Sequence, residues 1–211
     1  MTRALWLVRH GEGRGEADRR RGEQADRPHD PPLTDHGRWQ AARVGDRLRD
    51  RDADVAVVYS SPFLRAVETA HHVAERLDRP VFVDHGLSDH LDVDRFDVAP
   101  AVMTPRALAE RFDTVDASHT SVLRPNYPES AEEAADRTLR AVRRLATAVD
   151  DSPLFVGHAL TLTSVVAAFT GRTDVETPHC GLTRLTAYPW GWDVDLLADT
   201  SHLSDDGEDP G

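Results

Sequence analysis

Short apolar runs alternate with helical stripes along this chain of 211 residues. The runs at 4–8, 53–59 and 154–156 are too short for helices and are typical of strands buried on both faces of a parallel sheet. Between them, apolar residues recur at helical spacing. The clearest such stripe is Phe63, Val67, Ala70, Ala74 and Leu77. Strands that alternate with helices predict an α/β fold.

Local signals place the ends of the predicted helices. Thr34 is an N-cap candidate for a helix that ends near Asp50, and Ser61-Pro62 is a helix start signal. Ser130 with Glu133 forms a capping box before a long amphipathic helix. The remaining predicted elements are a third strand at 81–84, a helix at 105–112, a helix after 158 and a terminal hairpin at 181–188 and 192–198.

The chain is predicted to form one domain, residues 1–203, because no linker divides it into two apolar halves. A polar stretch at 13–32 has no periodicity and is expected to be a loop. The segment 86–130 is irregular and carries four prolines, which favours a lid over a binding site. Residues 204–211 are acidic and are expected to be a disordered tail.

Charge and cysteine content exclude several classes of protein. The net charge of −12 argues against nucleic-acid or anionic-membrane binding, so any anion site must be built locally. The single cysteine, Cys180, cannot form an internal disulfide or complete a usual zinc set beside His179. A single cysteine fits a reducing, cytoplasmic location. No run reaches signal-peptide or membrane-spanning length, so a soluble protein is expected.

Two strand ends carry the candidate chemistry. The first apolar run stops at Arg9-His10-Gly11, and the run at 154–156 stops at Gly157-His158 before a helix. Open α/β sheets bind ligands at the carboxyl ends of their strands. We therefore expect His10 to be a nucleophile toward phosphorus, Arg9 to hold the phosphoryl oxygens, and His158 to meet an anion.

The ordered motifs resemble one known family. LVRHGE at 7–12, PLTDHGRWQA at 32–41, YSSPFLRAVETA at 59–70, FVGHA at 155–159, CGLTRLT at 180–186 and DTSHL at 199–203 are similar to the motifs of the histidine phosphatase, or phosphoglycerate-mutase-like, superfamily. VDHGLSDHL at 83–91 and PNYPES at 125–130 resemble its Sts-type branch. The resemblance spans nearly the whole chain.

The resemblance implies a fold and a set of roles. The expected fold is a three-layer α/β/α sandwich with a mostly parallel mixed sheet, and the expected chemistry is phosphoryl transfer through a phosphohistidine without metal or cofactor. By position, His10 is the nucleophile, Arg9 and Arg65 bind the phosphoryl group, and His158 is a second, protonated histidine. Arg65 taken alone would be interpreted as an exposed surface arginine.

The general acid is where the chain departs from the family. Relatives usually supply it from a glutamate in a Leu-x-Glu pattern, and the matching residue here is Asp89. An ordinary aspartic acid is ionised at pH 7, and the alternative interpretation of Asp89 is an exposed loop carboxylate. The other candidates for the general acid are His90, Asp92 and Glu12. Gly13 and Glu16 also depart from the family pattern, and an added acidic group near a phosphate argues against a mutase.

Three functions are consistent with these residues. The leading one is a phosphatase acting on a phosphorylated small molecule or peptide; the others are a phosphoglycerate mutase and a non-catalytic phosphate-binding protein. Metal-dependent hydrolysis is disfavoured because no H-E-x-x-H pattern is present, and His71 and His72, adjacent on a helix, are expected to point apart. The sequence predicts neither the substrate nor the oligomeric state.

Overall fold

The computed structural model describes residues 4–14 and 29–204. Most of the polar stretch at 13–32, including Glu16, and all but the first residue of the acidic tail lie outside the described residues. Among the described helices, none combines the length and the apolar character needed to cross a bilayer.

Six strands form one mixed sheet in the order β3-β2-β4-β1-β5-β6. The strands are β1 (Ala4–Arg9), β2 (Val55–Ser60), β3 (Val81–Val83), β4 (Ser152–Gly157), β5 (Leu182–Tyr188) and β6 (Gly191–Asp199). The pairings β1–β4, β2–β4 and β2–β3 are parallel, whereas β5 pairs antiparallel with β1 and β6. The predicted mostly parallel mixed sheet is confirmed.

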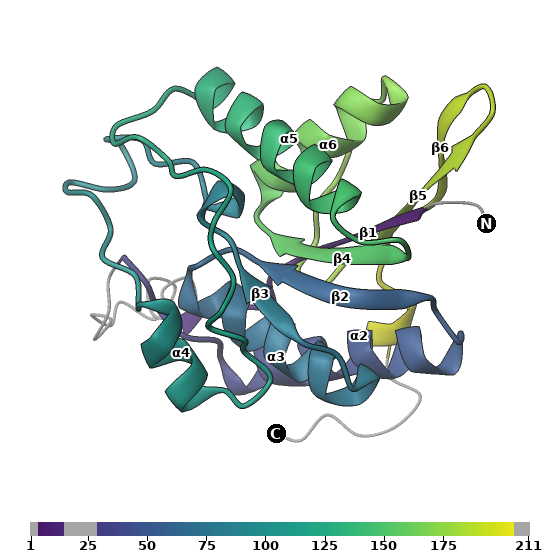
Figure 1. Cartoon of the computed structure of the whole chain (residues 1–211), viewed down its shortest axis with the longest axis horizontal. Coiled ribbons are helices and arrows are strands. Elements are labelled where there is room, and N and C mark those ends of the chain that lie inside the picture. The colour runs from purple at the N-terminus through teal and green to yellow at the C-terminus, as the bar shows by residue number, and fades with distance from the viewer. Residues whose placement is uncertain (1–3, 15–28, 205–211) are drawn as a thin grey trace.

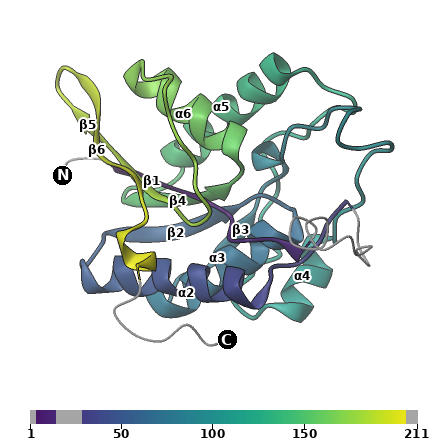
Figure 2. The same cartoon turned by 180° about the vertical axis from the view of Figure 1, so that it is seen from behind.

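Helices cover both faces of this sheet (Figures 1 and 2). On one side lie α2 (Asp35–Asp50) and α3 (Leu64–Leu77), and on the other α5 (Ala131–Thr147) and α6 (Ala159–Thr170). Alternate residues of β1 pack against opposite helical layers. Trp6 and Val8 belong to one apolar core, and Leu5 and Leu7 belong to the other. The three-layer α/β/α arrangement is thus built by two cores on one sheet.

Most predicted helix ends match the structure. Thr34 caps α2 by accepting a hydrogen bond from the Gly37 N–H, and Ser130 with Glu133 forms a complete capping box on α5. The predicted start of α3 at Ser61-Pro62 is wrong by two residues, because Phe63 is the N-cap. Ser61 Oγ instead lies 2.8 Å from His158 Nε2, so its role is in the site and not in the cap.

The long segment between β3 and α5 holds a short 3-10 helix, η1 (His85–Leu87), and the helix α4 (Pro105–Arg111). Figure 1 shows this segment beyond the end of the sheet where β2 and β4 terminate. Its residues Leu91 and Phe96 pack on Phe63, which immediately precedes α3. The segment thereby brings its polar side chains next to the strand ends.

Candidate active site

His10 and His158 follow adjoining parallel strands. Arg9 at the end of β1 is paired in register with Gly157 at the end of β4, and the His10 N–H donates to the Gly157 carbonyl at 3.0 Å. The two imidazole rings lie 5.2 Å apart between centroids. Residues separated by almost 150 positions in the sequence are therefore brought together by strand pairing.

The ring of His10 is held as a neutral imidazole. Its Nδ1 lies 2.8 Å from the Gly11 carbonyl oxygen and donates to it, while Nε2 accepts from the Arg65 Nε at 3.2 Å. Burial lowers the pKa of His10, and the positive charge of Arg65 lowers it further. Nε2 thus carries the lone pair that a nucleophile needs.

The loop after β1 is fixed by close contact with α2. A Cβ on Gly11 would lie 2.5 Å from the Gly37 carbonyl oxygen, so only glycine allows this approach. The Gly11 N–H donates to the Thr69 hydroxyl, which in turn donates to the Arg65 carbonyl. These bonds tie the loop that carries His10 to the helix that carries Arg65.

Arg65 is buried at the first turn of α3 and not exposed on the surface. Its Nη2 lies 2.9 Å from Asp89 Oδ2 and 3.3 Å from His158 Nδ1. Together with the bond to His10, the guanidinium contacts three site side chains. The interpretation of Arg65 as a surface residue is therefore wrong.

Asp89 lies in the same cluster, with only 4% of its surface exposed. Burial raises the pKa of its carboxyl, but the opposing effects of His158, Arg65 and Arg95 are larger and hold that pKa well below its usual range. The alternative of an exposed loop carboxylate is excluded. As the structure stands, Asp89 is ionised.

The substitutes considered for Asp89 point elsewhere. His90 Nε2 contacts the Glu129 carbonyl, and Asp92 Oδ1 accepts from the backbone N–H groups of two following residues. Glu12 Oε1 accepts from the Thr34 hydroxyl at the start of α2. Of the four candidate carboxyl and imidazole groups, Asp89 is the one that contacts Arg65 and approaches His158.

His158 is almost completely buried, and its two nitrogens have different neighbours. Nε2 lies 2.8 Å from Ser61 Oγ, while Nδ1 lies near Arg65 Nη2 and 3.4 Å from Asp89 Oδ2. Because a guanidinium can only donate, the neutral ring accepts at Nδ1 and donates from Nε2 to Ser61. Burial lowers the pKa of His158 to about 3, so the expected protonation requires an added negative charge.

Arg9 lies at the rim of the cluster, where its Nη1 donates to the Thr177 carbonyl at 2.7 Å. Its own carbonyl accepts from the Cys180 N–H. These contacts link the end of β1 to the segment that enters β5. The positive charge of Arg9 also contributes to the lowered pKa values of both His10 and His158.

Sequence reasoning missed two residues of the cluster. Arg95, from the segment after η1, makes two bonds to the Asp89 carboxylate at 3.1 and 2.8 Å, and His179 places its ring 5.4 Å from that of His10. Nothing in the local sequence singles out Arg95 among 25 arginines. His179 could have been noticed because it precedes the CGLTRLT segment, which pairs with the first strand.

The sequence from residue 5 to residue 200 matches the family model of the histidine phosphatase superfamily, branch 1. The chain belongs to the histidine phosphatase superfamily. A probable phosphoglycerate mutase GpmB of Klebsiella pneumoniae is 28% identical over 216 residues, with 94% of each chain covered. The ecdysteroid-phosphate phosphatase of Bombyx mori is also 28% identical, over 76% of this chain and 28% of that longer protein.

Solved structures agree with this assignment. The ecdysone phosphate phosphatase from Bombyx mori in complex with tungstate has a TM-score of 0.76 and 25% identity, with 98% of this chain and 97% of that chain covered. A mycobacterial glucosyl-3-phosphoglycerate phosphatase, at 20% identity and a TM-score of 0.65, shares the fold. The chain is thus a histidine phosphatase whose cluster of Arg9, His10, Arg65, Asp89 and His158 lies where the parallel strands end.

Proposed function

We propose that this chain is a metal-independent phosphomonoester hydrolase that acts through a phosphohistidine on a small-molecule or peptide phosphoester. The observation that carries the proposal is the lone pair of His10 Nε2, which faces the Arg65 guanidinium with the His158 ring 5.2 Å away. A buried neutral imidazole beside permanent positive charges suits attack on a dianion.

Substrate binding would exchange partners around Arg65. A phosphoryl oxygen can accept the Nε and Nη2 hydrogens that Arg65 now gives to His10 Nε2, His158 and Asp89. Arginine presents a planar fork of donors that matches a phosphoryl group. The exchange frees His10 Nε2 to approach phosphorus from the side opposite the leaving oxygen.

The two chemical steps then balance as follows. His10 Nε2 forms a bond to phosphorus while the phosphorus–oxygen ester bond breaks, and Asp89 gives its proton to the leaving alkoxide. In the second step the Asp89 carboxylate takes a proton from water as the water oxygen attacks phosphorus and the bond between phosphorus and His10 Nε2 breaks, which releases inorganic phosphate and neutral His10. Asp89 would be protonated for the first step because the dianion takes its partner Arg65 and adds a like charge.

His158 would stabilise the transferring group. A phosphoryl dianion beside Nδ1 favours the protonated ring and opposes the effect of burial, so His158 would gain a proton as the substrate binds. With Arg9 and Arg65 it would place three positive charges around the equatorial oxygens, a role that metal ions fill in other phosphoryl-transfer enzymes.

Hydrolysis of p-nitrophenyl phosphate in EDTA tests this proposal. The wild-type protein should turn over the ester, and His10→Ala should lose at least about 10³-fold in kcat. His36→Ala, at an exposed position of α2, is the matched control and should keep full activity. An active His10→Ala variant, or a wild-type protein that needs added metal, would refute the proposal.

The second candidate is a phosphoglycerate mutase, favoured by the full-length likeness to GpmB. In that enzyme the phosphohistidine would pass its phosphoryl group to a second hydroxyl and not to water. A coupled assay with 3-phosphoglycerate separates the two candidates. Isomerisation much faster than phosphate release would establish the mutase.

A further inference from the structure

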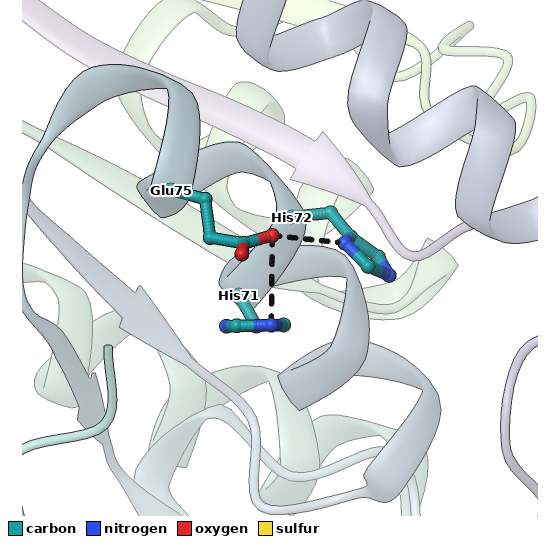
Figure 3. A group of neighbouring side chains, drawn as sticks. All are labelled: His71, His72 and Glu75. Carbon is teal, nitrogen blue, oxygen red and sulfur yellow. Dashed lines mark hydrogen bonds and ion pairs between the residues drawn. The ribbon is translucent and has the colours of Figure 1, made fainter. Parts of the chain in front are cut away.

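A second group of chemically active side chains lies outside the phosphate site, on the later turns of α3. His71, His72 and Glu75 bring one ligand atom each within 4.8 Å of one another (Figure 3). His71 Nε2 lies 3.5 Å and His72 Nδ1 3.2 Å from the same atom, Glu75 Oε2. The expectation that the two histidines point apart is wrong, because both rings turn toward the carboxylate one turn later.

We propose that His71, His72 and Glu75 form a surface binding site for one divalent transition-metal ion of the Zn²⁺ class. Two imidazoles and a carboxylate are a usual ligand set for such ions, whereas Mg²⁺ prefers oxygen ligands. Two nitrogens that bind the same metal ion, each about 2.1 Å from it, can lie at most about 4.2 Å apart. The ligand atoms here lie within 4.8 Å of one another, so small side-chain rotations would bring them to binding distance.

His71 is already oriented as a ligand. Its Nδ1 lies 2.9 Å from the Thr114 hydroxyl, and its ring packs against Phe112, with 5.1 Å between centroids. Metal-binding histidines usually bond their other ring nitrogen in this way, which fixes the ring and the nitrogen that faces the metal. The contact leaves His71 Nε2 directed at Glu75.

His72 supplies the adjustable ligand. Its side chain is one-quarter exposed, so the ring has room to rotate toward an ion. Arg76, whose Nη1 donates to the His72 carbonyl, also makes an ion pair with Asp46 on α2. That arginine is therefore engaged away from the three ligand atoms.

The surroundings favour a cation. Glu75 borders a groove of about 800 Å³, which is also lined by Asp78, Asp113 and Asp116 and by a single arginine, Arg79. Four carboxylates against one guanidinium give this groove a negative potential that raises the local concentration of cations. An ion on three protein ligands would keep open coordination positions toward solvent and the groove.

Calorimetric titration of the full chain with ZnCl₂, in a buffer free of phosphate because zinc phosphate is insoluble, tests the proposal. Wild-type protein should bind one Zn²⁺, and Mg²⁺ should give no binding. Glu75→Gln and His72→Ala should each weaken Zn²⁺ binding by at least tenfold, and Thr114→Val by about tenfold through loss of the bond to His71.

Two controls make the result decisive. His36→Ala removes an exposed histidine from the neighbouring helix and should leave Zn²⁺ affinity unchanged. Melting curves with and without Zn²⁺ should show a metal-dependent rise in Tm for wild type and a smaller rise for His72→Ala, while the metal-free curves verify that each variant folds. Wild-type affinity in a His71→Ala/His72→Ala double variant, or no binding at millimolar Zn²⁺, would overturn the proposal.

Discussion

Two buried arginine–carboxylate pairs lie next to each other in this protein and differ in what surrounds them. Arg137 binds both oxygens of Glu129 and gives its remaining hydrogens to the carbonyls of Gly86, Ser88 and Asp89. Arg65 binds one oxygen of Asp89 through Nη2 and also donates to the rings of His10 and His158 from Nε and Nη2. Beyond its carboxylate, Arg137 therefore donates to backbone carbonyls, whereas Arg65 donates to side chains.

This difference separates a structural pair from an exchangeable one. A carbonyl of the main chain cannot leave its donor without moving the loop, so the Arg137–Glu129 pair fixes residues 86–89. The side chains around Arg65 can be replaced as partners by phosphoryl oxygens, which accept the same hydrogens. The first pair therefore holds the backbone of Asp89 in place while the second keeps its carboxylate available.

Replacing Arg65 should give the largest effect on activity. We expect Arg65→Ala to lower kcat/KM by about 10³- to 10⁵-fold, because the phosphoryl charge loses its central donor. Stability should change little, since Asp89 keeps both bonds from Arg95. Activity toward p-nitrophenyl phosphate measures the loss of catalysis, and a urea unfolding curve measures the change in stability. An Arg65→Ala variant that does not fold would contradict the view that the Arg65–Asp89 pair is exchangeable and not structural.

Replacing Arg137 should instead affect stability. Arg137→Ala leaves Glu129 buried without its partner, which is expected to lower the free energy of unfolding by about 3–5 kcal/mol. The control Arg140→Ala, on the exposed face of α5 and paired with Asp136, should lose less than about 1 kcal/mol. A denaturant titration monitored by circular dichroism measures the free energy of unfolding of both variants. Equal decreases in Arg137→Ala and Arg140→Ala would mean that the buried pair is not structural.

The sequence was sufficient to predict the sheet, most helix ends and the meeting of His10 with His158, because periodicity and strand ends are local signals. The local pattern alone could not predict that Arg65 is buried, since an arginine on a helix is interpreted as exposed unless the packing around it is known; its place in the site followed from the resemblance to the family. Arg95 was missed for a related reason: its contact with Asp89 depends on the path of an irregular segment. That path follows from long-range packing of Leu91 and Phe96 on Phe63.

Acid should destabilise the protein through His158. Its pKa is lowered to about 3 in the folded state, so below its ordinary value of 6.5 the unfolded chain takes up a proton that the folded chain does not. Stability therefore falls as pH decreases, by up to about 1.4 kcal/mol per pH unit from this group. His158→Gln should flatten the dependence between pH 6.5 and 4.5, whereas His36→Gln should not.

The smallest predicted effect concerns Arg95, whose side chain is half exposed. Arg95→Gln removes a positive charge from Asp89, so the pKa of that carboxyl should rise and its proton should persist to higher pH. The alkaline limb of the kcat profile should then move to higher pH, with kcat about two- to fivefold above wild type on that limb.

The control for this measurement is Arg106→Gln, an exposed arginine on α4 that pairs with Glu110 and lies in the same long segment. Its profile should coincide with that of wild type. A lower kcat across the whole profile in Arg95→Gln, with no shift of the alkaline limb, would mean that Arg95 assists catalysis by orienting Asp89 and not by stabilising its charge. Asp89→Asn separates the two effects, because it removes the titrating group and should make kcat insensitive to the Arg95 substitution.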